Sequence, residues 1–360
     1  ALHPLPARTM VGIPTDLDAA RSSGALTEHA LARIAAEPGQ QPLPPLHADV
    51  SVGALVRDRL GNEIADRLVE PLLGGVYAGR ADALSLRATM PALATALAPG
   101  GSLVEAARAV VDGAAASDAA VFASLAGGLG GLPVALASSG RFEVRTGVTV
   151  RSIRRDGSGF ALACGAMPVS STERAEAVVM ATPAAKAARL MGDVAPDAAT
   201  DLAAIESAST AIVTLAYRDV ELPAGSGLLV GAREGLAVKG VTLSSQKWPL
   251  ATGGLVLLRA SVGRAGEAHL LQRADADLVA LVRHELRTLL GIVTDPVDAI
   301  VTRWGGGLPQ YALGHVDRIA RIRDAVAAVP GLAICGAAFD GVGIPACIAS
   351  ARAAATRLGQ

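Results

Sequence analysis

Residues 331–358, GLAICGAAFDGVGIPACIASARAAATRL, combine three signals in one short run. An apolar strand over 332–335 leads through glycines into an alanine-rich helix from about Pro345. Between them, Gly341-Val342-Gly343-Ile344-Pro345-Ala346 matches the G-x-G-x-x-G/A spacing of a dinucleotide-binding turn. Such a turn opens a βαβ unit and has an acidic residue about twenty positions further on. Here the sequence reaches Gln360 a few residues after the helix, so the turn needs another explanation.

Composition limits the classes of protein to consider. The 360 residues are 51% hydrophobic, with a mean hydropathy of +0.42 and a net charge of −1 at pH 7. A balanced charge without a long basic run gives little support to nucleic-acid binding. This length favours two domains or one elaborated domain. Three cysteines without a CxxC pair indicate small buried thiols in a reducing, cytoplasmic setting.

The order of apolar and turn residues predicts α/β pieces at 119–190 and 330–360, with other structure between and before them. A helical block follows Ser51, which can cap its first helix, and Ser102 stands in a capping-box pattern further on. Strand-like runs punctuated by Gly, Pro or Ser from about 200 to 304 predict a largely antiparallel sheet. This interleaving is typical of a flavoenzyme whose nucleotide-binding domain is assembled from separated segments.

An uncharged run at 119–140 would be long enough to cross a bilayer. Several glycines followed by Pro133 break it at its centre. We therefore expect a buried strand at 121–125, a glycine turn, and a helix that has Pro133 in its first turn and ends near Ser138. Another strand is expected over 142–156, where apolar and polar residues alternate.

Four long stretches resemble the oxygen-dependent porphyrinogen oxidases, flavoenzymes that dehydrogenate protoporphyrinogen or coproporphyrinogen late in haem synthesis. They occur in the family order: RLVEPLLGGVYAGRADALSLRATMPAL (67–93), TLSSQKWP (242–249), TRWGGGLPQYALGH (302–315) and CGAAFDGVGIPACIASAR (335–352). The soluble actinobacterial type is the most similar. The resemblance implies an α/β, FAD-linked oxidoreductase fold with α+β insertions. Its flavin domain is built from separated segments, beside an antiparallel-sheet substrate domain and a helical subdomain.

The resemblance also implies a division of the chain. In order, it has an irregular, proline-rich substrate-domain segment at 1–50, a helical subdomain at 51–116, a FAD-binding segment at 117–195, the substrate domain at 196–330 and a C-terminal FAD-binding segment at 331–360. In the family the dinucleotide fingerprint lies in an N-terminal βαβ unit, and this chain begins at a point that resembles the family after that unit. We therefore expect a unit of about thirty residues or more ahead of residue 1. Without it, the 360 residues are expected to be inactive.

The resemblance implies a different role for the closing glycine turn. It is similar to the loop that passes under the pyrimidine ring of the flavin, where N–H groups at a helix N-terminus stabilise negative charge. Val342, Gly343 and Ile344 would supply these contacts, and Gly336 and Gly341 belong to the same cofactor-binding segment. An ordinary turn that starts a helix is the alternative interpretation.

Two more positions match cofactor contacts of the family. Val148 matches a strand residue whose backbone pairs with the adenine edge, and Trp304 matches a tryptophan beside the isoalloxazine. From pattern alone, Val148 would be a buried strand valine and Trp304 a large core residue. Thr182 and the turn at 127–131 resemble the cofactor region less specifically.

The family chemistry sets what the substrate site must provide. Aromatisation of a porphyrinogen removes six electrons; FAD accepts the hydride and oxygen regenerates it. The protein then needs a wide apolar cavity with cations at its rim for propionates. TLSSQKWP is the candidate for one wall: Leu243 and Trp248 would give apolar surface, and Ser245 and Lys247 would reach carboxylates. A solvent-facing hairpin is the alternative. The sequence contains no catalytic-triad or metal-ligand pattern, so we name no catalytic residue and expect no metal.

These expectations describe an FAD-dependent oxidase of coproporphyrinogen III that uses molecular oxygen. Protoporphyrinogen IX, with two propionates instead of four, is the alternative substrate. A flavin amine oxidase or desaturase and a flavin-free, non-catalytic fragment are further alternatives. Peripheral membrane contact and an encounter with a downstream haem-pathway enzyme also stay open.

Overall fold

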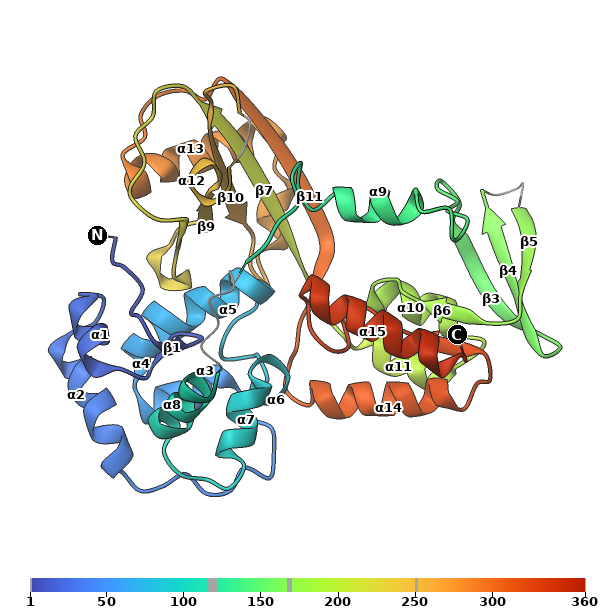
Figure 1. The fold of residues 1–360 in the computed structure, drawn as a ribbon, viewed down its shortest axis with the longest axis horizontal. Helices are drawn as coiled ribbons and strands as arrows, with labels where there is room; N and C mark the ends of the chain where they lie inside the picture. Colours follow the sequence, from blue (N-terminus) through green and yellow to red (C-terminus); the bar gives the residue numbers. More distant parts are fainter. Residues whose placement is uncertain (1, 115–121, 167–169, 250–251, 360) are drawn as a thin grey trace.

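The computed structural model describes residues 2–114, 122–166, 170–249 and 252–359 (Figure 1). They pack around three main hydrophobic cores: one in a helical block, one on an antiparallel sheet and one in an α/β part. In Figure 1 the sheet lies above the helical block, and the α/β part extends beside them. Within the described residues, no helix is both long enough and apolar enough to span a membrane.

The helical block forms because short amphipathic helices pool their apolar sides in one core. Ser51 caps α3 by accepting the N–H of Ala54, and Ser102 caps α8 by accepting that of Glu105, as predicted. The elements are β1 (Thr9–Met10), β2 (Ile13–Pro14), α1 (Leu17–Ser22), α2 (Glu28–Ala36), α3 (Val52–Arg59), α4 (Asn62–Ile64), a π-helical turn (Ala65–Val69), α5 (Glu70–Tyr77), α6 (Leu86–Thr89), α7 (Pro91–Leu97) and α8 (Leu103–Gly113).

The expectation that residues 1–50 are irregular was wrong over α1 and α2. Asp16 and Thr27 cap these helices, and their apolar sides join the core of the helical block. The prolines at 42, 44 and 45 come after these helices in the chain and leave them uninterrupted. Gly74 and Gly75 both lie inside α5. Packing of α5 in the core outweighs the low helix propensity of glycine.

A buried ion pair ties the end of α2 to the rest of the helical block. The Glu37 side chain is fully buried, and Oε1 accepts hydrogen bonds from Arg59 Nε at 2.7 Å and Leu103 N at 2.9 Å. Oε2 accepts from the Ser102 hydroxyl and from Val104 N. Burial by itself would raise the pKa of Glu37, but the hydrogen bonds from Ser102, Leu103, Val104 and Arg59 outweigh burial and lower it. The carboxylate therefore stays charged with its acceptor sites filled.

The second region is a five-stranded antiparallel sheet in the order β11-β7-β10-β9-β8. Alternate residues of its strands pack on a long helix, so one face is covered, whereas the opposite face carries exposed side chains such as Arg259, Ile300 and Trp304. Its elements are β7 (Ser207–Tyr217), β8 (Gly227–Leu229), β9 (Val238–Leu243), α12 (Ser244–Lys247), β10 (Val256–Val262), α13 (Asp275–Leu290) and β11 (Asp298–Pro309). The predicted antiparallel sheet is confirmed.

The third region brings together segments that are about 150 residues apart in the chain. β6 and β12 form a two-stranded parallel pair, with Val179 opposite Ala333. Such pairing of separated segments agrees with the predicted fold class. The elements are β3 (Val150–Asp156), β4 (Gly159–Gly165), β5 (Ser170–Ala175), β6 (Val178–Met180), α10 (Ala184–Met191), α11 (Pro196–Ala203), α14 (His315–Ala327), β12 (Leu332–Ile334) and α15 (Ile344–Arg357).

The segment that leads into β3 departs from expectation. Residues 122–125 are exposed and form no strand, while residue 121 lies outside the described residues. The helix expected around Pro133 is present as α9 (Gly131–Ala137), with Ser138 at its C-cap. β3 begins at Val150, not near residue 142. Alternation of apolar residues predicts a strand only where a neighbouring strand pairs with it, and β4 pairs with β3 only from Val150 onward.

Candidate functional site

The glycine turn at Gly341–Ile344 lies where the three regions meet. It joins β12 to α15, and Val342 packs against the core of the helical block. In Figure 1 the N-terminal end of α15 points toward the lower end of β11 and the helical block. A ligand at this turn would therefore contact more than one region of the molecule.

The two glycines of the turn serve different purposes. Gly341 has a φ of 137°, and a Cβ placed there would stand 2.9 Å from the Ala346 Cβ, so the backbone itself requires glycine. Gly343 has a φ of −75° and is the N-cap of α15. A Cβ on Gly343 would meet only the Pro345 ring, at 3.8 Å, which is ordinary contact. Glycine at 343 therefore leaves open space on the exposed side of the turn.

The backbone N–H groups of this turn suit an electron-rich ring edge. Those of Val342, Gly343 and Ile344 donate to no other described residue, and Gly343 and Ile344 are exposed. They stand at the N-terminus of a 14-residue helix, where helix dipole and unpaired donors favour negative charge. The turn therefore fits the pyrimidine side of a flavin.

Two buried aromatic side chains fix the segment before the turn. Tyr311 donates its hydroxyl hydrogen to the carbonyl of Ala337 at 2.5 Å, and His315 Nε2 lies 2.9 Å from the carbonyl of Ala338. Their rings stack with centroids 4.3 Å apart. Because a carbonyl can only accept, His315 carries its proton on Nε2. Both residues lie in the stretch TRWGGGLPQYALGH, where sequence reasoning selected only Trp304.

Burial controls the ionisation of these two anchors. It raises the pKa of Tyr311 well above its ordinary value, against a smaller opposing effect of the Gly341 N–H. It lowers the pKa of His315, although the Ala338 carbonyl opposes that shift. Both side chains are therefore neutral near pH 7 and act as hydrogen-bond donors that position the backbone.

Gly336 lies at the carboxyl end of the parallel pair, the edge where ligands bind in α/β sheets. Its φ is 130°, and its N–H donates to the Ser350 hydroxyl of α15 at 3.1 Å. The N–H of Cys335 donates to Met180 O at 3.0 Å, which aligns the ends of β6 and β12. The structure thus gives Gly336 a role in joining the strand end to α15.

The other two cofactor candidates lie outside the hydrophobic cores. Val148 is 39% exposed and precedes β3, so it is not the buried strand valine that pattern alone suggested. Trp304 is 54% exposed on β11, which excludes the interpretation as a core residue. In Figure 1, β3 lies toward the C-terminal end of α15 and the glycine turn lies at its other end. Contacts with the two ends of an elongated cofactor would need such a separation.

The structure leaves only part of TLSSQKWP available for the wall that the sequence suggested. Leu243 is 1% exposed and belongs to the core between the sheet and α13, because it faces the covered side of β9. Ser245 Oγ accepts the N–H of Leu257 at 2.9 Å, so this hydroxyl is engaged by β10. Lys247 Nζ lies 4.9 Å from the ring centre of Phe122 and 5.6 Å from that of Trp248. Lys247 and Trp248 thus keep partly accessible side chains, whereas Leu243 and Ser245 serve the sheet.

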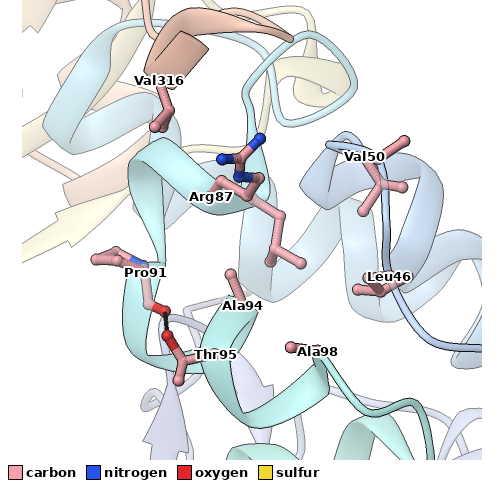
Figure 2. A pocket seen from close by; sticks show the side chains of 10 residues that line it. Leu46, Val50, Arg87, Pro91, Ala94, Thr95, Ala98 and Val316 are labelled. Atoms are coloured by element: carbon pink, nitrogen blue, oxygen red, sulfur yellow. Dashed lines mark hydrogen bonds between the residues drawn. The ribbon is translucent and has the colours of Figure 1, made fainter. Parts of the chain in front are cut away.

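An apolar groove of about 310 Å³ lies elsewhere, in the helical block (Figure 2). Leu46, Val50 and Ala94 line it, and Val316 of α14 closes one end. Arg87 at its side is paired with Asp317. None of the cofactor or substrate candidates lines this groove, so it is separate from the glycine turn.

Comparison with known proteins supports a flavin cofactor for this chain. The family "Flavin containing amine oxidoreductase" matches residues 5–359. The chain belongs to this family. The predicted flavin cofactor and oxidoreductase class are thereby confirmed.

Three named proteins are similar to this chain over nearly its whole length. Coproporphyrinogen III oxidase of Mycobacterium tuberculosis is 38% identical over 99% of this chain and 76% of the relative. The Bacillus subtilis enzyme of the same name is 32% identical, over 98% and 76%. A crystal structure from Exiguobacterium sp. 255-15, provisionally named a protoporphyrinogen oxidase, has a TM-score of 0.85 at 33% identity. It covers 100% of this chain and 78% of that one.

Proposed function

We propose that this protein oxidises coproporphyrinogen III to coproporphyrin III with FAD and molecular oxygen. The observation that carries the proposal is 38% identity, over nearly the whole chain, to enzymes named for that reaction. The N–H groups of Val342, Gly343 and Ile344, which donate to no other described residue, support it, because they would give the chain a place for the flavin ring. Cytoplasmic location, peripheral membrane contact and a downstream partner enzyme remain predictions.

In this proposal the chain positions the reactants and the cofactor carries the redox chemistry. When bound, FAD would supply the acceptor for hydride from the porphyrinogen, and oxygen would reoxidise it. The N–H groups of Val342, Gly343 and Ile344 would hold the pyrimidine side of the ring, with Trp304 beside the ring system. Val148 would pair through its backbone with the adenine. We further propose that the β6–β12 part is the flavin domain and the five-stranded sheet is the substrate domain.

The position of Trp304 supports this arrangement. Its strand runs directly into Gln310 and Tyr311, and Tyr311 holds the segment that precedes the glycine turn. The sheet and the turn are therefore connected by a short, hydrogen-bonded path. A substrate on the sheet would then lie next to the flavin ring.

The test is oxidation of both porphyrinogens by FAD-loaded protein, followed by porphyrin fluorescence. The 360 residues alone and a form extended by a dinucleotide-binding unit ahead of residue 1 are assayed together. We expect coproporphyrin III to form faster than protoporphyrin IX in the extended form. Protoporphyrin formation alone would favour the activity after which the Exiguobacterium structure is named. No porphyrin from either substrate, in protein that holds flavin, would refute the proposal.

A further inference from the structure

The face of the five-stranded sheet that points away from α13, here called the open face, has a defined set of residues, of which Ala208, Thr210 and Ala216 are themselves buried. Along β7, residues 211, 213, 215 and 217 enter the core on α13, so the even-numbered residues face the other way. The register then assigns the strand residues of this open face. They are Ala208, Thr210, Ile212, Thr214 and Ala216 of β7, Leu257, Arg259 and Ser261 of β10, Gly240 and Thr242 of β9, Gly227 and Leu229 of β8, and Asp298, Ile300, Thr302 and Trp304 of β11.

The open face is apolar and hydroxyl-bearing, with one cation near its middle. Ile300, Trp304 and Leu229 are 59%, 54% and 37% exposed. Arg259 stands on the third of five strands, between Thr214 of β7 and Thr242 of β9. The register assigns one other charged side chain to this face, Asp298, which lies on the edge strand one row further along and accepts the N–H of Ala299.

Arg259 is exposed, and it takes part in no ion pair or hydrogen bond with another described residue. Arg303 on β11, by contrast, faces α13 and pairs with Asp275. An exposed guanidinium surrounded by hydroxyls and apolar surface is suited to a carboxylate carried by a flat apolar molecule.

We infer that Arg259 binds a propionate carboxylate of the tetrapyrrole, which lies with its macrocycle against the open face. This inference rests on the proposed function and adds the cation that the sequence could not place. Trp304 shares the face. It lies four residues along the strand direction, or roughly 13 Å at 3.3 Å per residue, and two strands across, or roughly 10 Å at 4.8 Å per strand. A substrate with one carboxylate on Arg259 can therefore extend toward the tryptophan that we propose lies beside the flavin.

The test compares a charged and a neutral porphyrin on matched variants of the FAD-loaded extended protein. Coproporphyrin III and its tetramethyl ester are titrated, by fluorescence, into wild type, Arg259→Gln, Arg259→Lys and Arg287→Gln. Arg287 is an exposed arginine of α13, on the other side of the sheet, and serves as the matched control. Circular dichroism confirms that each variant is folded.

We expect Arg259→Gln to bind coproporphyrin III about tenfold more weakly, because a hydrogen-bonded charge pair is lost. Arg259→Lys should recover part of that loss, and the ester should bind wild type and variants alike. Equal coproporphyrin binding by wild type and Arg259→Gln would overturn the inference, as would an equal loss for the ester. Failure of wild type to bind either porphyrin would instead refute the proposed function. If Arg259→Gln does not fold, wild type and Arg259→Lys decide the test. The inference is overturned if Arg259→Lys binds coproporphyrin III as tightly as wild type does and wild type binds the acid and the ester equally.

Discussion

The buried Glu37–Arg59 ion pair with its hydrogen bonds, here called the Glu37 clamp, and the glycine turn differ in whether their polar groups are already paired. In the clamp, a fully buried carboxylate accepts hydrogen bonds from Arg59, Ser102 and two backbone N–H groups. At the turn, the N–H groups of Val342, Gly343 and Ile344 bond to no other described residue. The clamp therefore stabilises the fold, while the turn keeps its donors available to a ligand. The same distinction separates Arg59, which is paired inside, from Arg259, which is exposed.

The largest expected effect is on stability, at the clamp. Glu37→Gln removes the charge opposite buried Arg59, and we expect the free energy of unfolding to fall by about 3–5 kcal/mol. Urea denaturation measures it. Glu105→Gln on the exposed first turn of α8 is the control and should cost less than about 1 kcal/mol. If folded Glu37→Gln protein lost flavin affinity by a free energy as large as its loss of stability, the contrast between the clamp and the glycine turn would be contradicted.

The clamp also predicts how stability depends on pH. The pKa of Glu37 is lower in the folded protein than its ordinary value of 4.5. Its contribution is therefore present above about pH 4.5 and is lost as the pH falls through the folded pKa. Denaturation series at several pH values should show a shallower acid decline in Glu37→Gln than in wild type. Parallel declines would assign the acid sensitivity to other groups.

A substitution in the glycine turn should lower FAD affinity and leave the free energy of unfolding nearly unchanged. Gly343→Ala is tolerated by its backbone and neighbours, so unfolding should change by less than about 0.5 kcal/mol. The added methyl group would stand against the ring, and FAD affinity should drop about tenfold. Flavin fluorescence titration measures the affinity, with Gly39→Ala, also in open space, as the control. Unchanged FAD affinity in Gly343→Ala would mean that the turn only starts a helix.

A smaller effect is expected at the anchor of the turn. Tyr311→Phe keeps the ring stack on His315 but removes the hydroxyl that donates to Ala337 O, and should cost about 1 kcal/mol of stability. FAD affinity should fall two- to threefold, or about 0.5 kcal/mol, because the segment before the turn is less firmly held. Tyr77→Phe is the control, since the Tyr77 hydroxyl bonds to no other described residue. Equal effects of both substitutions would remove the special role of Tyr311.

The sequence was most informative where structure depends on neighbouring residues. Ser51 and Ser102 cap helices as expected, and the helix after the glycine turn begins at Ile344. The strand expected at 121–125 failed because a strand needs a pairing partner that local alternation does not reveal. Arg259 was missed for a similar reason. Its place at the middle of an open face follows only from the register of three strands.

The candidate site residues also divide into those that local sequence predicts and those that depend on distant parts of the chain. The resemblance predicts that the glycine turn is a cofactor segment, and its N–H groups at Val342, Gly343 and Ile344 donate to no other described residue. It did not reveal that Leu243 faces the core, because one residue of shift along a strand reverses the side on which a side chain lies. Tyr311 and His315 could not be assigned from sequence, since their partners are carbonyls more than twenty residues away.

Amide hydrogen exchange of residues 341–347, with and without FAD, tests the central claim most directly. The account predicts that exchange of the Val342, Gly343 and Ile344 N–H groups slows when FAD binds, while the already bonded amides of α14 change little. Flavin binding that leaves these three amides exchanging at their original rate would contradict it.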